Sequence, residues 1–400
     1  MNLSSPAESP DIPGPSLTAQ LPQGTITVSI DYAEIPAQRL FSFATRANPK
    51  RAFLFLSHVL GKHLPVDVAT MGDVHTRIAA HIPELPDPIV FVGMAETATC
   101  LGQGVFEAWL REHPQREALF LHTTRYHVGG AHRVSFEEAH SHAPQQWFFL
   151  PPDPHRRALL HHARSLVLID DEISTGDTLV NLVGAMQSCS PALAHLHLAA
   201  ITDWMGPQRR KELTSRCHIA CSIGALLYGS WHFTPHLSTF PIPAPELSND
   251  PNAPTIRDSG YGRLGVTSAI SLEPKFLQHL AKPLARCDRV LVLGTGEFMH
   301  PAYVLARELH AASKAKVWMH ATTRSPILTW GPIRNVLSFP DNYGAGVPNY
   351  VYNYQAGDYD CIFLCAEMDA SGSLKHLARH LGARLFFFLP GGRIAEDSLC

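Results

Sequence analysis

The sequence predicts an α/β fold, with a doubly wound parallel sheet in a first domain and a second, smaller α/β domain after it. Short apolar strands alternate with amphipathic helices along most of the 400 residues, which is the pattern of parallel βα units. Strands that end at Gly93, His122 and Asp170 each lead into a polar turn. Because ligands bind beyond the carboxyl ends of parallel strands, these turns are expected to share one site.

The composition favours a large globular protein. Hydrophobic residues make up 45% of the chain, and the net charge of −3 argues against non-specific nucleic-acid binding. No apolar run approaches the ~20 residues of a membrane span, and the polar N-terminus does not look like a signal peptide. We therefore expect a cytoplasmic protein that binds neither nucleic acid nor membrane, with eight reduced, mostly buried cysteines.

The chain is expected to divide into four segments. Residues 1–22 are polar and proline-rich, as in a disordered tail, and residues 23–232 form the first domain. Residues 233–258 are a proline-rich linker with little periodicity, and residues 259–400 form the second domain.

Hydrophobic periodicity locates the elements of the first domain. Strands are expected at 25–30, 88–93, 118–122, 147–150, 166–169, 196–202 and 219–228, the last of them at a sheet edge. Helices are expected at 48–61, from about 99 to 112, at 154–163 and after Thr178. In this last helix one apolar face is formed by positions i, i+3, i+4 and i+7, which are Leu179, Leu182, Val183 and Met186.

The second domain shows the same alternation and is predicted to be another α/β unit. Strands are expected at 289–293, 315–320, 361–365 and 384–389, helices at 302–313 and 374–381, and an aromatic stretch lies at 350–354.

The stretch Ser165–Thr178 carries the strongest chemical signal. An apolar strand leads into Asp170 and Asp171, and the polar turn Ser174–Thr178 then opens a helix. Unpaired N–H groups at a helix start can bind an anion, and Gly176 lets the backbone turn sharply towards a phosphate. The carboxylates stand where ribose hydroxyls or a hydrated Mg²⁺ would lie. The pattern indicates a sugar-phosphate site; a simple helix cap is the alternative.

The two domains also share a sequence pattern. Residues 89–96 and 290–297 each combine an apolar strand with a glycine and a glutamate, and each is followed by a helix and a second strand. Both second strands end in Thr-Thr-Arg, at 123–125 and 322–324. A related site geometry is predicted, with chance similarity as the alternative. The second copy lacks the Asp-Asp and Ser-Thr-Gly run, so we do not expect it to hold a phosphoribosyl group in the same manner.

These motifs resemble those of a known family. Ser165–Thr178 resembles the phosphoribosyl-pyrophosphate signature of type I phosphoribosyltransferases. From about Arg46 to its end, the chain resembles the phosphoribosyltransferases of bacterial tellurite-resistance gene clusters, in which an orotate-phosphoribosyltransferase-like domain precedes a domain named for a Thr-Arg-Ser-Pro motif, here 323–326. Further family-like stretches are 48–51, 61–66, 93–99, 122–125 and 137–143.

The resemblance implies a type I phosphoribosyltransferase-like domain followed by a TRSP-type domain. The implied enzyme uses phosphoribosyl pyrophosphate and Mg²⁺ to ribosylate a nucleobase-like small molecule with release of pyrophosphate. Its product would be a nucleotide-like metabolite of a stress-response pathway, and a homodimer is a possible assembly.

The resemblance also assigns the candidate site residues. Those expected to bind the donor are Met94, Ala95, Glu96, Thr97, Asp170, Asp171, Ser174, Thr175, Gly176, Asp177 and Thr178. Those expected to be catalytic are Asp170, Asp171 and, at the root of a mobile lid or within it, Arg125, Glu138, His140 and His142. Mg²⁺ is expected on Asp170, Asp171 and the pyrophosphate. Glu96 departs from the pattern, because a carboxylate repels phosphate unless it engages Mg²⁺ or an amino group of the base.

Three groups have more than one interpretation. The His-Ser-His run at 140–142 fits a lid used in proton transfer or base contacts, a metal cluster, or an ordinary polar loop. The basic residues Lys50, Arg51, Lys62 and His63 fit a solvated helix face or an anion-contacting edge. In the second domain the candidate pocket residues are Arg263, Glu297, His300, Thr323, Arg324 and Ser325, with an aromatic core edge as the alternative.

Two other functions remain as alternatives to the transferase. A non-catalytic phosphoribosyl-pyrophosphate sensor is disfavoured, because the sequence shows no basic recognition helix and the net charge is acidic. A nucleotide phosphorylase or hydrolase is the other alternative, because the same ribose site would serve the reverse chemistry.

Overall fold

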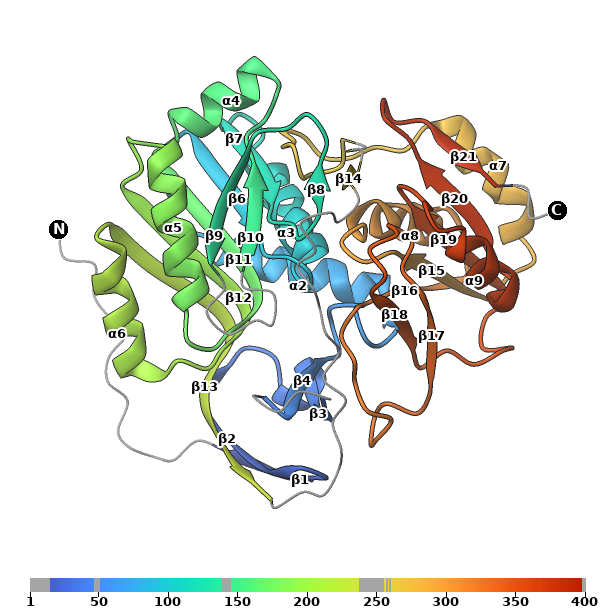
Figure 1. The fold of residues 1–400 in the computed structure, drawn as a ribbon, viewed down its shortest axis with the longest axis horizontal. Helices are drawn as coiled ribbons and strands as arrows, with labels where there is room; N and C mark the ends of the chain where they lie inside the picture. Colours follow the sequence, from blue (N-terminus) through green and yellow to red (C-terminus); the bar gives the residue numbers. More distant parts are fainter. Residues whose placement is uncertain are drawn as a thin grey trace.

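The computed structural model of the protein describes residues 15–46, 51–137, 145–236, 255–256, 258 and 260–397. Two sheets lie side by side, and helices α2 (Val68–Ala80), α3 (Thr99–Glu112) and α8 (His300–Ala312) pack against one another between them (Figure 1). The molecule is therefore an α/β protein built on two sheets with a shared helical layer.

The first sheet has the strand order β1-β2-β13-β12-β11-β6-β7. Its strands are β1 Ser16–Leu21, β2 Gly24–Ala33, β6 Ile89–Gly93, β7 Ala118–His122, β11 Ser165–Ile173, β12 His195–Asp203 and β13 Ala220–Pro235. From β13 to β7 all neighbours are parallel, whereas β2 is antiparallel to β13 and β1. The chain places β7 on one side of β6 and β11 on the other, so the direction of winding switches between β6 and β11.

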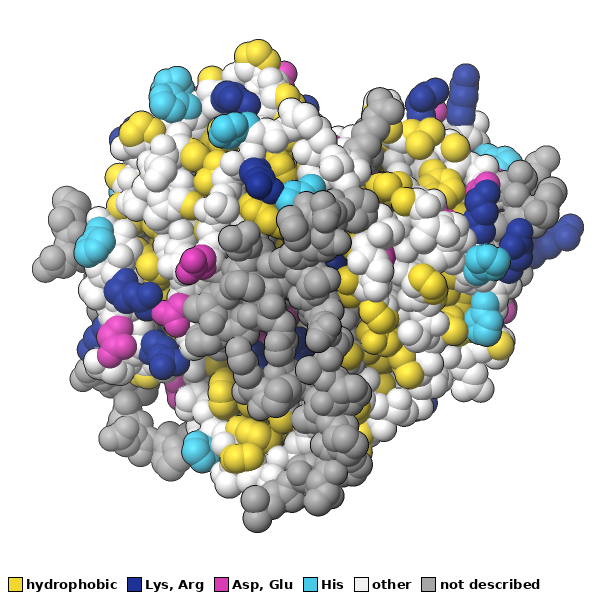
Figure 2. All heavy atoms as spheres, in the orientation of Figure 1, with side chains coloured by type: hydrophobic (Ala, Val, Ile, Leu, Met, Phe, Trp, Pro, Cys, Tyr) yellow, Lys and Arg dark blue, Asp and Glu magenta, His cyan; other side chains and the backbone are white. Residues whose placement is uncertain are grey.

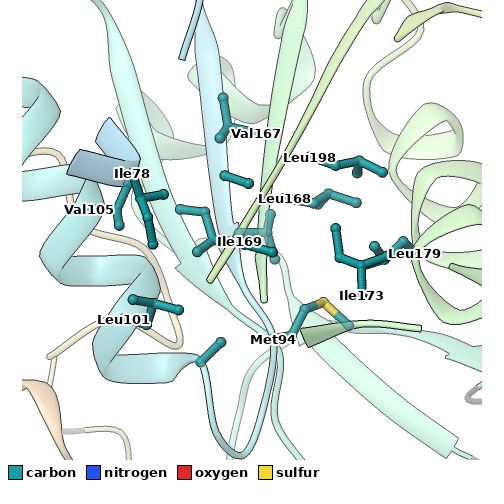
Figure 3. Close-up of a cluster of buried hydrophobic side chains, with 14 of the residues drawn as sticks. Ile78, Met94, Leu101, Val105, Val167, Leu168, Ile169, Ile173, Leu179 and Leu198 are labelled. Carbon is teal, nitrogen blue, oxygen red and sulfur yellow. The ribbon is translucent and has the colours of Figure 1, made fainter. Parts of the chain in front are cut away.

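Helices cover both faces of this sheet, as the doubly wound prediction requires. One face carries α2 and α3, and the other carries α4 (Pro154–His161), α5 (Asp177–Cys189) and α6 (Gly206–Cys217) (Figure 1). Side chains of β11 alternate between the two layers: in Figure 3, Leu168 lies near Leu198 and Leu179, and the α2 and α3 side chains lie on the opposite side. The predicted fold class is confirmed.

The second sheet has the order β21-β20-β19-β15-β16-β5. Its strands are β5 Val66–Asp67, β15 Arg289–Gly294, β16 Lys316–Ala321, β19 Cys361–Ala366, β20 Arg384–Phe388 and β21 Ile394–Glu396. The four inner strands are parallel, and α7 (Pro274–Leu284), α8 and α9 (Ser373–Leu381) pack with them. The edge strand β5 comes from the first half of the chain and pairs with β16. The polypeptide therefore contributes to the second sheet well before it reaches the expected linker.

Smaller elements complete the described residues. They are α1 Ala37–Leu40 and the pairs β3 Phe41–Thr45 with β4 Phe53–Ser57, β8 His127–Val128 with β14 Thr255–Ile256, β9 Arg133–Glu137 with β10 Gln145–Phe149, and β17 Val336–Pro340 with β18 Pro348–Tyr352. At the surface, charged side chains of both signs lie together over α6 (Figure 2). No helix among the described residues is long and apolar enough to cross a membrane.

The expected helix at 48–61 is wrong over its described part. Phe53–Ser57 is strand β4, paired with β3. Phe53 and Phe55 enter the core of the first sheet, whereas Leu54 and Leu56 pack against Ile327 of the second half of the chain. The strand is therefore buried on both sides, and a short two-sided apolar run has no periodicity that separates it from a helix.

Three other expectations need correction. Residues 16–21, expected in a disordered tail, form β1. The strand expected at 219–228 extends to Pro235, into the expected linker, and is an inner strand because β2 pairs with it. Cys287 and Cys361 form a disulfide, because β15 and β19 start side by side and bring together two residues 74 apart in sequence.

Close packing of α3 on β6 gives a stability prediction. A Cβ at Gly102 would lie 2.7 Å from the Cα of Gly93, whereas nothing lies within 4 Å of a Cβ at Gly184 in α5. Gly102→Ala should therefore lower the free energy of unfolding by about 1–3 kcal/mol. The control Gly184→Ala should raise it by about 1 kcal/mol, because alanine favours a helix. Urea denaturation measures both, and equal effects would contradict the packing described.

Candidate functional site

The carboxyl ends of β6, β7 and β11 meet at one place. The backbone N–H of Met94 donates to the carbonyl of Ile169 at 3.0 Å, and that of Ala95 donates to the Oγ1 of Thr123 at 2.8 Å. The Thr97 hydroxyl donates to Asp171 Oδ1 at 2.6 Å. The turn after β6 therefore touches the segments after both neighbouring strands, at the point where the winding of the sheet switches.

The turn before α5 has the geometry of an anion cradle. Gly176 has a left-handed φ of 77°, and a Cβ there would lie 2.0 Å from a Leu213 methyl carbon, so only glycine fits. Ser174, Thr175 and Thr178 are half-buried around the start of the helix. The Asp177 carboxylate pairs with Arg216 of α6 at 2.6 Å, and its donor-binding role stays a prediction.

Asp170 and Asp171 lie side by side just beyond the buried part of β11. The Asp171 N–H donates to Asp170 Oδ1 at 2.9 Å. Burial and then the neighbouring Asp171 carboxylate raise the pKa of Asp170 well above its usual value. Two adjacent carboxylates repel each other, and their hard oxygen atoms suit a divalent cation such as Mg²⁺. The same oxygen atoms can accept hydrogen bonds from the paired hydroxyls of a ribose.

Glu96 is neutralised by cations from two parts of the chain. Its Oε1 lies 2.7 Å from the Nζ of Lys62, and its Oε2 lies 3.7 Å from the Nε of Arg324 in the second domain. Burial alone would raise the pKa of Glu96, but these two cations outweigh it and hold the pKa at about 2. The peptide between Ala95 and Glu96 is cis. These two cations offset the charge of the carboxylate, so Glu96 need not repel a phosphate.

Lys62 is a buried residue for which the sequence left two interpretations open, a solvated helix face and an anion-contacting edge. Its side chain is 1% exposed, and its ammonium also donates to the carbonyl of Gly296 at 2.6 Å. His63 is 4% exposed, so a solvated helix face is wrong for both residues. Lys50 lies outside the described residues. A family-like Gly-Lys-His run was the available signal, but its partner 34 positions later could not be identified from it.

The hairpin of β3 and β4 brings further arginines to the acids of β11. Arg51 Nη2 lies 2.5 Å from Glu172 Oε1. The Arg46 side chain is half-buried near Arg51, Asp171 and Glu172, and partial burial, then the charge of Arg51, lowers its pKa to about 10. Arg46 and Glu172 were not among the predicted site residues.

Arg125 lies at the beginning of the segment predicted to be a lid. Its backbone N–H donates to Glu297 Oε1 at 2.9 Å, and the hydroxyl of Thr124 donates to Glu297 Oε2. Further along, Glu137 ends β9, and its carbonyl accepts a hydrogen bond from Asn181 of α5 at 2.9 Å. The other predicted catalytic residues, which are Glu138, His140 and His142, lie outside the described residues.

The predicted second-domain pocket divides into two groups. Arg263 makes a bidentate pair with Glu367, with both distances 2.7 Å, and its Nε lies 3.3 Å from Glu297 Oε2. His300 lies beside this cluster and is neutral, since burial lowers its pKa to about 4. The cavity left between them is about 10 Å³, which is space for about one water.

The second group is Thr323, Arg324 and Ser325, of which Arg324 contacts the first domain. Thr323 pairs with Tyr350 through the backbone, and its hydroxyl accepts from the Ser325 N–H at 3.1 Å. Arg324 instead reaches the turn of Glu96 and lies 4.9 Å from the centre of the Tyr126 ring. Sequence spacing grouped Arg324 with Arg263, because both belong to the second half of the chain.

A parallel sheet with a phosphate-loop turn and an adjacent acid pair defines a phosphoribosyltransferase-like protein. Comparison with protein families agrees: residues 40–230 match the family described as phosphoribosyl transferase, and residues 260–381 match the TRSP domain C-terminal to it. The chain belongs to this family of phosphoribosyltransferases with a TRSP domain. The suspected family is thereby confirmed, and no curated protein matches the chain.

Solved adenine phosphoribosyltransferases are among the similar structures. The Rhodothermus marinus enzyme is 15% identical, with 48% of this chain and 96% of that chain covered and a TM-score of 0.32. The Giardia lamblia enzyme with 9-deazaadenine is 16% identical, with 49% and 98% covered and a TM-score of 0.34. The Trypanosoma brucei enzyme with AMP, pyrophosphate and ribose-5-phosphate is 12% identical, with 50% and 82% covered and a TM-score of 0.34.

The Lys62–Glu96 pair gives a pH-dependent prediction. The pKa of Glu96 falls from 4.5 to about 2 on folding, so the pair stabilises the protein above pH 4.5 and this contribution is lost as the pH falls towards 2. Lys62→Met removes one partner of a buried pair and should cost about 3–5 kcal/mol near neutral pH.

The loss should shrink on acidification, because Glu96 can then take up a proton. Adding Glu96→Gln to Lys62→Met should recover part of the stability, because no buried carboxylate is then left without its closest cation. Urea denaturation across the acidic range measures both effects. A loss independent of pH would show that Lys62 acts through packing alone.

Proposed function

We propose that the protein transfers the phosphoribosyl group of phosphoribosyl pyrophosphate to a nitrogen of a nucleobase-like acceptor. The observation that carries the proposal is the hydrogen bond between Thr97 and Asp171, which joins the turn after β6 to the acid pair after β11. The turn Ser174–Thr178 follows that acid pair on the same strand-to-helix connection. A donor with a phosphate at one end and a pyrophosphate at the other could therefore span the two turns.

Each part of the site has a role in this reaction. N–H groups at the start of α5 and the hydroxyls of Ser174, Thr175 and Thr178 hold the 5′-phosphate. Asp170 and Asp171 hold the ribose hydroxyls and orient C1 towards the acceptor. The backbone of Met94–Thr97 and the cations beside it hold the pyrophosphate. The bond from C1 to the pyrophosphate oxygen breaks with its electron pair on the leaving group, and the acceptor nitrogen forms the new bond to C1.

Mg²⁺ fits this site through the carboxylates of Asp170 and Asp171, whose repulsion a divalent cation would relieve. When bound, the ion neutralises charge on the pyrophosphate as it departs. Based on the gene clusters of the family it resembles, we place the product among the nucleotide-like metabolites of a stress response.

Removing the acid pair should abolish binding of the donor. In calorimetry with phosphoribosyl pyrophosphate and Mg²⁺, the double variant Asp170→Asn, Asp171→Asn should bind about a hundredfold more weakly or not at all, because it loses charged hydrogen bonds to the donor. Asp73→Asn, whose side chain is 56% exposed on α2, is the matched control and should bind normally. Unchanged affinity in the double variant would contradict the site.

Incubation with a panel of nucleobases separates an enzyme from a sensor. The proposed transferase should release pyrophosphate with at least one nucleobase-like acceptor, and the same double variant should not. Donor binding by the natural protein without release across a broad panel would favour the sensor.

Donor binding should also release a proton. The raised pKa of Asp170 means that the free protein keeps a proton there to a higher pH than an ordinary carboxyl. Binding with Mg²⁺ requires the carboxylate, so affinity should increase as the pH rises through that pKa. Calorimetry in two buffers of different ionisation enthalpy measures the proton, and Asp170→Asn should remove its release. The same proton count in that variant would assign the release elsewhere.

A further inference from the structure

The two domains repeat one arrangement at the ends of their central strands. Thr123 Oγ1 accepts a hydrogen bond from Ala95 N at 2.8 Å, and Thr322 Oγ1 accepts the equivalent bond from Gly296 N at 2.9 Å. In each sheet the winding switches beside this turn, between β6 and β11 and between β15 and β19. The similarity of the two Thr-Thr-Arg segments is therefore structural: they lie at equivalent places on equivalent strands.

The two copies face each other and exchange contacts. Glu96 in the turn of the first domain lies 3.7 Å from Arg324 of the second Thr-Thr-Arg. Glu297, its counterpart in the second domain, accepts from the backbone N–H of Arg125 in the first Thr-Thr-Arg at 2.9 Å. Reciprocal contacts of this kind are those of a two-fold interface, here between two parts of one chain.

The second copy of the site is closed by its own side chains. Register with the central strand places Glu367 where the first sheet has Asp171, and Glu367 is held by Arg263. The N-terminus of α9 is filled as well, because Asp369 Oδ2 accepts from Leu374 N at 3.1 Å. Gly372 has a φ of 73°, close to that of Gly176, so the loop shape is kept while its anion position is taken.

Glu96 is not a close ion-pair partner of Arg324. Lys62 lies closer to that carboxylate, at 2.7 Å against 3.7 Å. Arg324 makes no hydrogen bond within the described part of the chain, and its side chain is 14% exposed. The aromatic ring of Tyr126 lies against its guanidinium. A guanidinium held in this way presents a planar fork of N–H donors, which suits two phosphate oxygens.

We propose that Arg324 binds the pyrophosphate of the donor, so that the TRSP domain supplies one wall of the transferase site. This inference rests on the proposed function, because it assigns a ligand to the same turn. Glu96 and Tyr126 fix the guanidinium at the turn, and Lys62 balances the charge of Glu96. The second domain thus acts as the partner half of a two-fold site of which one copy is open.

Binding of the two ends of the donor tests this inference. Inorganic pyrophosphate with Mg²⁺ and ribose 5-phosphate are titrated separately into the full chain. Arg324→Gln should weaken pyrophosphate binding about ten- to hundredfold, the effect of losing charged hydrogen bonds. Ribose 5-phosphate should bind as before, because its phosphate lies at the start of α5.

Two further variants keep the test decisive. Arg324→Lys keeps the charge and loses the fork, so pyrophosphate should bind severalfold more weakly even if Arg324→Gln folds poorly. Arg307→Gln removes another second-domain arginine, one that pairs with Glu107 of α3 at 3.0 Å, and should leave both ligands unaffected.

Each outcome separates this inference from the proposed function. If the natural protein binds both probes and the Arg324 variants bind pyrophosphate normally, the role of Arg324 is wrong and the transferase site stands. Equal weakening of both ligands would show a structural role for Arg324 and would also overturn the inference. If the natural protein binds neither probe, the proposed function itself fails.

Discussion

The buried ion pair between Lys62 and Glu96 is the interaction on which the site depends. Lys62 follows the β3–β4 hairpin, Glu96 belongs to the turn after β6, and the ammonium also binds the Gly296 carbonyl in the second domain. Three segments far apart in sequence are thereby fixed relative to one another. Desolvation offsets much of the Coulombic gain of such a pair, so its main effect is on geometry.

This geometry explains how an acid can occupy the turn that we propose binds pyrophosphate. A free carboxylate at Glu96 would repel the proposed ligand, but Lys62 at 2.7 Å and Arg324 at 3.7 Å offset its charge. The low pKa of Glu96 keeps the carboxylate charged, so the cations stay in place across the range in which a phosphorylated ligand is itself ionised. The acid therefore positions the two cations at the turn where we propose that the ligand binds.

Local signals in the sequence predicted the local structure well. The run Ser165–Thr178 gave the strand, the glycine turn and the helix, and Leu179, Leu182, Val183 and Met186 are its buried residues. Strand β4 was not predicted, because both of its faces are buried. Its residues Phe53–Leu56 are therefore all apolar and show no alternation that would indicate a strand. The pairing of Glu96 with Lys62 and Arg324 could not be predicted, because it depends on how two sheets dock.

The internal repeat could be recognised in the sequence, but the contacts between its two copies could be seen only in the structure. Thr-Thr-Arg and the glutamate turn looked like two similar sites, and the structure shows two halves that contact each other reciprocally. Sequence comparison correctly found no acid pair in the second copy. It could not show that Glu367 occupies the place of Asp171, or that Asp369 accepts a hydrogen bond at the start of α9.

The same strand-and-turn geometry therefore serves opposite purposes in the two domains. In the first, burial and then the neighbouring Asp171 carboxylate raise the pKa of Asp170, and we propose that the two acids bind the donor. In the second, Glu367 and Glu297 are both satisfied by Arg263, and Tyr343 donates to Glu367 at 2.7 Å. Charges that could bind a substrate there bind one another instead. Glu297 of this cluster also accepts from the backbone N–H of Arg125, so the cluster ties the second domain, which carries Arg324, to the first domain beside the proposed donor site.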